Sequence, residues 1–316
     1  MTSGFRPWTR GDLFVALTTL DKPEDDHAGV GHIRQYGADL QLKGEIALTQ
    51  TSHLVGGLKF DSRGVLWAFD SHDHVVLNLH RDGRVEVRSL PPRAFSHVNF
   101  AADGSFYLGE HVIGNSIKPE IQARMKTYIS KIPGTDRFGD GHVFKFDAAG
   151  KLLKEYATET HGGMGGFLGV TMSALSPDGK RLVYCSETGP RLLQYDLAND
   201  RQMPDIQNIQ PPFPPGPPPM FFGMDYGPDG ALYVLRGGAI HVVDELTGKT
   251  TRQVPLEGFG WAVIDLAKDA RYAFVASFFT GEVAKIDLAS GQKMGSIQTG
   301  AVKSLAGIVE YQGEQS

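Results

Sequence analysis

The chain has 316 residues, a net charge of −5 and 41% hydrophobic residues, with lysine and arginine scattered along its length. A weakly acidic chain without a basic stripe is not expected to bind nucleic acid. No stretch is apolar for long enough to cross a bilayer or to form a signal peptide ahead of the first expected strand, so we expect a cytoplasmic protein without membrane contacts. The single cysteine, Cys185, excludes a disulfide framework and a cysteine metal site.

The chain begins with three expected strands, at residues 13–17, 33–36 and 44–48. The stretch after them, residues 54–90, is a more complete unit of four short apolar or alternating segments. Turn residues such as Arg81-Asp82-Gly83 separate these segments, which indicates tight antiparallel hairpins. Four hairpin-linked strands that recur along a chain are typical of one blade of a β-propeller.

The four-stranded unit recurs with a period of about 40 residues, as expected for one blade. The first turn of each unit supplies the marker, and the equivalent positions are Gly64, Gly104, Gly179, Gly230 and Ala270. Longer gaps between markers indicate insertions. Five blades are explicit in this register, at residues 54–90, 98–157, 171–206, 223–256 and 263–299.

The sixth blade is expected to combine both ends of the chain. The three strands within residues 12–49 lack an inner partner, and residues 305–311 form a lone apolar strand. Pairing them closes the ring and removes the open edges that would otherwise promote aggregation. We therefore predict an all-β, six-bladed propeller that occupies residues 1–316 as one domain.

The third blade contains an insertion at residues 112–140. Within it, residues 118–131 carry apolar side chains at helical spacing, with Pro119 near the start and Pro133-Gly134 after the end. This pattern predicts one amphipathic helix. The helix would either form a lid over the rim of the ring or pack on the side of the blade, and the sequence does not favour one of these alternatives.

Two further loops have unusual compositions. Residues 158–169 are rich in glycine but lack the strand and helix that flank a phosphate-binding loop, so no nucleotide site is predicted there. Residues 210–222 contain a run of prolines that ends in Met220, Phe221 and Phe222. This run is predicted to be a stiff rim loop that places the three apolar residues near the axis, although a polyproline ligand for a partner domain is the alternative.

Histidines from separate blades are expected at one rim of the ring. Inner strands begin at that rim and second strands end there, so the loops that join them share it. The expected metal ligands are His53, His97, His111 and His161, with His72 beside them. Neutral imidazole is a ligand of Zn, Fe and Mn, and three or four histidines leave a position open for water or substrate. The alternative for each histidine taken alone is a polar side chain of the rim or core.

Acidic and apolar residues are expected at the same rim. Glu110 and Glu187 are the predicted catalytic acids, as ligand or general base, and Asp70 could orient a ring nitrogen. Arg236 is predicted to meet an anionic group of the substrate. The expected pocket walls are apolar, and they are Met164, Phe167, Phe221, Phe222, Trp261, Phe278 and Phe279.

The blade pattern in GLKFDSRGVLWAFDSHDHVVLNLHRDG and MDYGPDGALYVLRGG resembles the six-bladed propellers of the NHL repeat, SMP-30/gluconolactonase and strictosidine synthase groups. The resemblance covers most of the chain and implies the fold rather than an activity. In the SMP-30 group, a glutamate on the first inner strand, with an asparagine and an aspartate from later blades, holds a divalent ion. No matching triad is evident in this sequence.

These observations favour a metal-dependent enzyme, a lyase, hydrolase or oxygenase, that acts on a small, partly apolar or aromatic molecule. The cofactor is expected to be a divalent ion, with Fe, Zn or Mn preferred by the histidines. Two alternatives stay open. One is a calcium-dependent lactonase of the SMP-30 type, and the other is a non-catalytic propeller that binds a peptide or protein.

Overall fold

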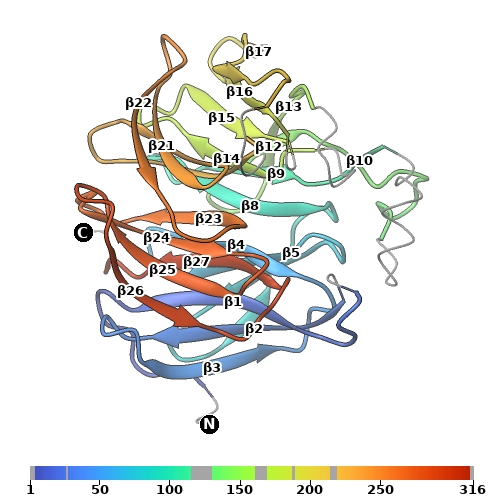
Figure 1. Ribbon diagram of the computed structural model, residues 1–316. Helices are drawn as coiled ribbons and strands as arrows, with labels where there is room; N and C mark the ends of the chain where they lie inside the picture. The colour runs from blue at the N-terminus through green and yellow to red at the C-terminus, as the bar shows by residue number, and fades with distance from the viewer. Residues whose placement is uncertain are drawn as a thin grey trace.

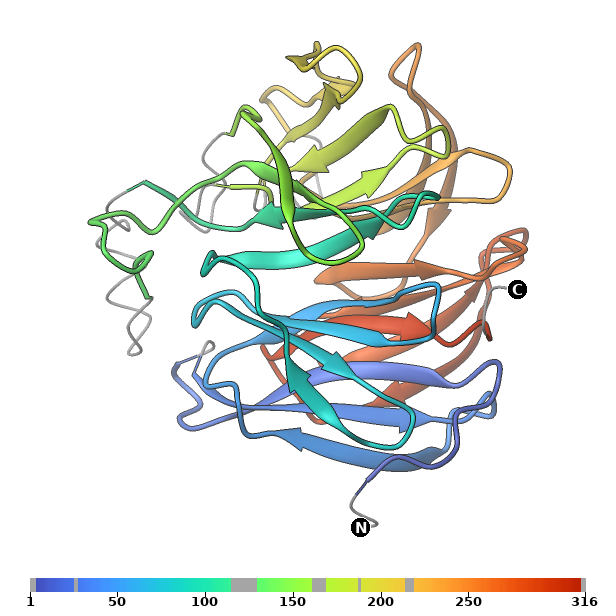
Figure 2. The ribbon, with the colours of Figure 1, turned by 180° about the vertical axis from the view of Figure 1, so that it is seen from behind.

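The computed structural model describes residues 4–25, 28–114, 130–160, 169–186, 189–213 and 219–313. Its described strands form six antiparallel sheets that follow one another around a ring, and a separate two-stranded hairpin (Figures 1 and 2). The expected six-bladed β-propeller is confirmed. In the described ranges, no helix has the length and apolar character needed to span a membrane.

The first blade unites the two ends of the chain, as predicted. The blue strands β1 to β3 and the red strand β27 share one sheet in Figure 1. Strand β27 pairs antiparallel with β1, with Leu13 opposite Glu310 and Val15 opposite Ile308. The sheet has the order β27 (Leu305–Glu310), β1 (Leu13–Leu20), β2 (Gly29–Tyr36) and β3 (Leu42–Leu48).

Blades 2 and 3 follow the same pattern. Blade 2 contains β4 (Val55–Phe60), β5 (Leu66–Asp70), β6 (Val75–Leu79) and β7 (Val85–Val87). Blade 3 contains β8 (Phe95–Phe100), β9 (Phe106–Glu110), β12 (Val143–Phe146) and β13 (Leu152–Tyr156). The insertion in blade 3 begins and ends as a separate hairpin, β10 (Ile113–Gly114) paired with β11 (Gly139–Asp140).

The helix predicted at residues 118–131 falls outside the described residues except for Ser130 and Lys131. The described end of the insertion packs on blade 2, because the Ser130 amide donates to the carbonyl of His72 at 3.2 Å. The Ser130 hydroxyl lies 3.5 Å from a carboxylate oxygen of Asp73. The insertion of blade 3 therefore touches the loop between β5 and β6.

Blades 4 to 6 complete the ring. Blade 4 contains β14 (Met172–Leu175), β15 (Arg181–Cys185), β16 (Arg191–Asp196) and β17 (Arg201–Gln202), and β18 (Gln207–Asn208) also pairs with β16. Blade 5 contains β19 (Phe221–Tyr226), β20 (Leu232–Arg236), β21 (Ala239–Asp244) and β22 (Lys249–Pro255). Blade 6 contains β23 (Trp261–Leu266), β24 (Tyr272–Ser277), β25 (Glu282–Asp287) and β26 (Lys293–Gln298).

The inner strands enclose a central channel. In order around the ring they are β27, β4, β8, β14, β19 and β23, and each contacts the next, with β23 returning to β27. Glycines allow the close approach of these backbones. A Cβ on Gly57 of β4 would lie 2.0 Å from the carbonyl oxygen of Ser96 on β8.

The core consists of six apolar clusters, one between each pair of neighbouring blades. Each second strand has a blade on both of its faces, so its side chains are buried on both sides although they alternate in direction. All five residues of β5 and of β9 are buried. This packing explains why the second strands read as continuous apolar runs in the sequence.

Candidate functional site

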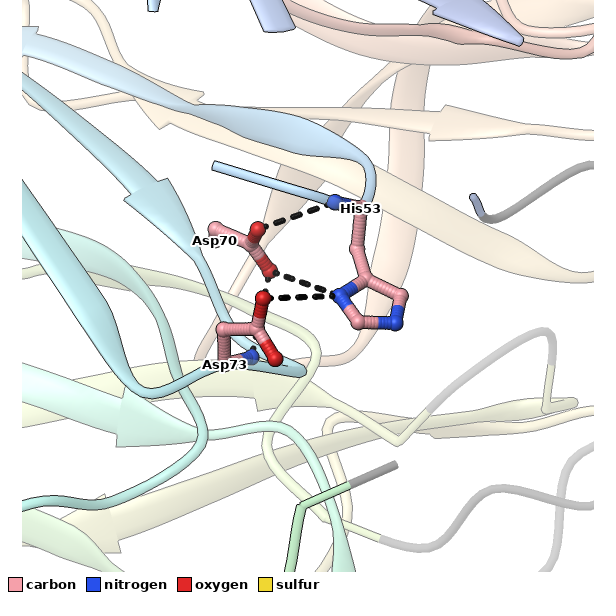
Figure 3. Close-up of side chains that lie close together, drawn as sticks. All are labelled: His53, Asp70 and Asp73. Carbon is pink, nitrogen blue, oxygen red and sulfur yellow. Dashed lines mark hydrogen bonds and ion pairs between the residues drawn. The ribbon is translucent and has the colours of Figure 1, made fainter. Parts of the chain in front are cut away.

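His53, Asp70 and Asp73 meet at one end of blade 2 (Figure 3). His53 lies in the connection from β3 to β4, where its backbone bridges to Ala28 of blade 1. Asp70 ends β5, and the antiparallel register places it opposite Val55, two residues after His53. Asp73 follows in the loop to β6. The start of an inner strand and the end of a second strand therefore come together at one rim, as the sequence predicts.

The imidazole of His53 is held through its Nδ1 atom. This atom lies 3.3 Å from Oδ2 of Asp73 and 3.8 Å from Oδ1 of Asp70. The Ser52 hydroxyl lies 3.1 Å from the same nitrogen and donates to Asp73. Because carboxylates accept and do not donate, Nδ1 carries the proton in the neutral ring. The aspartates thus select the tautomer in which Nε2 holds the lone pair.

Asp70 is a fully buried anchor for the two loops. One carboxylate oxygen accepts hydrogen bonds from the backbone amides of Ser52 and His53, each at 3.0 Å. The other oxygen accepts from the amides of His72 at 3.1 Å and Asp73 at 3.3 Å. Burial raises the pKa of Asp70, and the charge of His53 opposes that rise. With both oxygens occupied by amides, Asp70 orients the ring of His53 and is poorly placed to be a direct metal ligand.

The second ring nitrogen of His53 is buried and unsatisfied in the described part of the structure. His53 is only 2% exposed, and its buried Nε2 has no hydrogen-bond partner among the described residues. In Figure 3 this nitrogen points away from both aspartates. A buried polar atom without a partner costs stability, and this nitrogen is a candidate for ligand binding or proton transfer, although the indole nitrogens of Trp8 and Trp67 also lack a partner in the described ranges. A histidine that donates through one nitrogen to a carboxylate and offers the other is the usual arrangement of a metal-binding histidine.

Two further histidines continue from His53 along the rim. The ring of His72 stacks on that of His53, with centroids 5.0 Å apart and an interplanar angle of 19°. The ring of His111 lies 6.2 Å from that of His72. The ring of His72 therefore lies near the rings of both predicted ligands, His53 and His111.

His97 is close to this row but is bonded differently. Its Nδ1 lies 2.8 Å from the Ser96 hydroxyl, and its Nε2 lies 2.5 Å from the Ser173 hydroxyl on blade 4. Burial, with a smaller effect from His111, lowers the pKa of His97 to about 3. A Cβ on Gly109 would lie 2.4 Å from the ring, so only glycine leaves room for it. Both nitrogens of His97 are thus occupied by hydroxyls rather than facing His53.

Glu110 is buried beneath the insertion. Its Oε2 accepts from the backbone amides of Asp140 at 2.6 Å and Gly141 at 2.9 Å, and Arg93 lies 3.4 Å from Oε1. Burial raises the pKa of Glu110 to about 7, although Arg93 and the amides oppose this. These contacts join β9 to the hairpin of the insertion, so Glu110 fixes the base of the insertion next to the histidines.

The predicted wall residues separate into two groups. Phe221 and Trp261 are buried in the clusters between blades, where they pack, and Phe222 packs against one of these clusters. Phe279 is 44% exposed and stacks on Phe259, which is 58% exposed, with centroids 6.0 Å apart. Phe278 adjoins Phe279 at 5.3 Å. The exposed phenylalanines lie in loops at the blade ends that form the rim, and sequence reasoning missed Phe259.

Four predicted site residues, His161, Met164, Phe167 and Glu187, lie outside the described residues. Sequence reasoning also gave no role to Asp73, which it treated as part of a polar loop. It overlooked a group of charges in the channel as well, formed by Lys59, Asp225 and Asp265. Their common register, five residues before the turn marker of each blade, could have revealed this group.

No family model matches the sequence, and no curated protein matches it. Solved structures share the fold. A chain of the nidogen/laminin complex has a TM-score of 0.59 at 11% identity, over 96% of this chain and 99% of that one. A catalytically inactive histidine-to-alanine variant of virginiamycin B lyase from Staphylococcus aureus, with quinupristin, has a TM-score of 0.55 at 13% identity, over 93% and 92%. A streptogramin B lyase structure has a TM-score of 0.53 at 13% identity, over 94% and 91%.

Proposed function

We propose that the chain is a metal-dependent enzyme, a lyase or hydrolase, that acts at the histidine-lined rim on a small, partly apolar molecule. The observation that carries the proposal is the buried Nε2 of His53, which has no partner in the described part of the chain and whose ring is fixed from the other side by Asp73. Desolvating His53 and Asp70 costs stability, and such costs are concentrated at functional sites.

The fold leaves the activity open, so the proposal is supported by the chemistry of the site. The propellers of similar fold include virginiamycin B lyase, streptogramin B lyase and a chain of the nidogen/laminin complex. The blade consensus and these fold neighbours support a place among the NHL, SMP-30 and strictosidine synthase-like propellers. Their low identity carries no activity to this chain.

The donor set favours a transition metal. His53 through Nε2 is the first ligand we propose, and His72 and His111 are the imidazoles next along the rim. Among the described residues, the group that brings its ligand atoms within 4.8 Å of one another is His53, Asp70 and Asp73. Imidazole nitrogen suits Zn, Fe and Mn, whereas calcium takes six to eight oxygen atoms. Asp70 has both oxygens occupied by amides, so the described residues offer few free oxygens for calcium. The calcium-dependent lactonase is therefore the weaker alternative.

The roles of the side chains follow from their contacts. A metal at this rim would polarise a carbonyl group or lower the pKa of a bound water. Asp73 retains the Nδ1 proton of His53 and keeps Nε2 unprotonated for coordination or proton transfer. The exposed pair Phe259 and Phe279 offers an apolar contact to the substrate. An oxygenase would need the same ligands with a redox metal.

Elemental analysis of protein purified without a histidine tag tests the proposal. We expect near-stoichiometric Zn, Fe or Mn in the wild-type chain and a sharp loss in His53→Ala. The matched control is His80→Ala, since His80 pairs with Glu86 in the hairpin between β6 and β7 and should leave the metal content unchanged. Wild-type protein that takes up no transition metal after incubation with each ion would exclude the proposal. The exposed phenylalanine pair would then favour a propeller that binds an apolar partner.

A further inference from the structure

Arg236 ends β20 at the same rim as the histidines, but on blade 5. Its side chain is half-buried, and its guanidinium lies 5.7 Å from the ring centroid of Phe221. One guanidinium nitrogen donates to Oε1 of Gln207 at 2.5 Å, and another lies 3.1 Å from Nδ1 of His241. Both acceptors are neutral groups.

The charge of Arg236 is not balanced by any described carboxylate. Two other half-buried arginines have acidic partners, since Arg191 has Asp205 and Glu159, and Arg93 has Asp140 and Glu110. Arg88 also lacks an acid among the described residues, but it lies over the rings of Trp67 and Phe106. No described aspartate or glutamate lies within ion-pair distance of Arg236. Burial alone lowers the pKa of Arg236, with no acid to offset it. A desolvated cation without a counter-charge is costly, and a bound anion would remove that cost.

The two neutral acceptors fix the guanidinium without cancelling its charge. Gln207 donates through Nε2 to the carbonyl oxygen of Gly248 at 2.8 Å, which turns its Oε1 toward Arg236. His241 accepts at Nδ1, and burial together with Arg236 lowers the pKa of His241 to about 4. His241 therefore stays neutral near pH 7. Two of the five guanidinium N–H groups are engaged in this way, and the remaining donors can bind two oxygens of one anion.

We infer that Arg236 binds an oxyanion, a carboxylate or a phosphate, carried by the substrate of the proposed enzyme. The inference rests on the proposed function for the reacting group but adds the class of substrate. Blade 5 is opposite blade 2 in the ring order, and Arg236 and His53 each lie at the end of their blade that forms this rim. The substrate would place its anionic group at Arg236 and its reacting group at the histidines.

Isothermal titration at low ionic strength with three related probes tests this inference. The probes are benzoate, phenyl phosphate and the neutral benzyl alcohol, and the protein is the full chain as purified. We expect at least one of the two anions to bind and the alcohol not to bind. Binding of benzoate alone would identify a carboxylate substrate, and binding of phenyl phosphate alone would identify a phosphate ester.

Substitutions assign the binding to this side chain. Arg236→Gln should weaken the anion at least about tenfold, and Arg236→Lys should retain part of the affinity because lysine keeps the charge but not the paired donors. Arg252→Gln is the control, since Arg252 is an exposed arginine on β22 of the same blade that bonds only neutral acceptors. Circular dichroism and thermal unfolding verify that each variant is folded.

The inference is wrong if neither anion binds to the wild-type chain, if Arg236→Gln binds them equally well, or if benzyl alcohol binds as tightly. Elemental analysis of the same samples shows whether the anion site and the proposed metal centre fail together or separately. Unchanged metal content with lost anion binding in Arg236→Gln supports both proposals. Anion binding that depends on Arg236 in a chain without metal would support the anion site and reject the metal centre.

Discussion

Lys59 of blade 2 reaches across the central channel to Asp225 of blade 5, with 3.6 Å between its Nζ and Oδ2 of the aspartate. Its side chain is 39% exposed, as expected for a residue that lines the channel. Asp225 and then Asp265 raise the pKa of Lys59, with burial opposing them. Opposite blades are thus joined through one ammonium group.

Removing this ammonium group should destabilise the ring. In Lys59→Met, Asp225 would be left without its counter-charge, and we expect a loss of about 2 kcal/mol in the free energy of unfolding, less than for a fully buried pair. Urea unfolding measures the loss. Lys154→Met is the matched control, because Lys154 is equally exposed and pairs with Asp200 on the outer surface. Its expected cost is below about 0.5 kcal/mol. Equal losses in the two variants would contradict a special role for the channel pair.

The pH dependence of stability should report on Asp265. Burial is the main cause that raises its pKa from 3.8 to about 7. Between these values the folded chain holds a proton that the unfolded chain has lost, so this group adds stability below about pH 4 that is lost as the pH rises to about 7. The Asp265→Asn variant cannot ionise at this position. Between pH 5 and pH 8, its free energy of unfolding should therefore fall by about 2 kcal/mol less than that of the wild-type chain. Parallel stability curves for the two proteins would show that Asp265 is already ionised at pH 5.

The aspartates around His53 should differ in their effects. Asp73→Asn keeps the loop but weakens the hold on Nδ1, so we expect metal affinity to fall about tenfold or more with little change in thermal stability. Asp70→Asn places amide hydrogens against backbone donors and should lower thermal stability as well. Metal titration and thermal unfolding of both variants distinguish these effects. Asp82→Asn, in the exposed hairpin of the same blade, is the control for loss of a carboxylate.

The repeated first turn of each blade offers a reciprocal test of backbone strain. Gly230 has a φ of 76°, and Ala270, at the equivalent position of the next blade, has a φ of 51°. Left-handed backbone costs alanine about 1 kcal/mol relative to glycine. Ala270→Gly should therefore stabilise the protein by about 0.5 to 1 kcal/mol, and Gly230→Ala, whose Cβ would meet no atom within 4 Å, should destabilise it by about 1 kcal/mol. Chemical unfolding that gives the same sign for both substitutions would refute this account.

The fold was accessible from the sequence because each blade repeats one pattern. The turn markers fix the register of successive blades, and a lone C-terminal strand has one open edge to pair with, that of β1. The placement of His53, His72 and His111 at one rim follows from the same register. Periodicity therefore predicts which end of a blade a residue occupies.

The bonding within the site could not be predicted in the same way. Ser173 of blade 4 occupies one nitrogen of His97, and amides from residues 140 and 141 occupy the carboxylate of Glu110. These partners are distant in the sequence, and their contacts depend on side-chain rotamers and loop paths rather than on strand register. Asp73 lies in a loop whose pattern resembles any solvated turn. Its role depends on the position of the His53 ring.

Because β27 closes the ring, the first blade cannot form completely until the C-terminal strand has been synthesised. Strand β1 is made early, but its inner hydrogen-bonding edge has no partner until residues 305–310 have left the ribosome. The nascent chain therefore exposes an unpaired β-edge for most of its translation time, which is a hazard for association between growing chains. A circular permutant that joins the present ends and opens a connection between two blades would make β27 and β1 adjacent in the chain and leave every blade contiguous. It would shorten that exposure while leaving the finished ring unchanged.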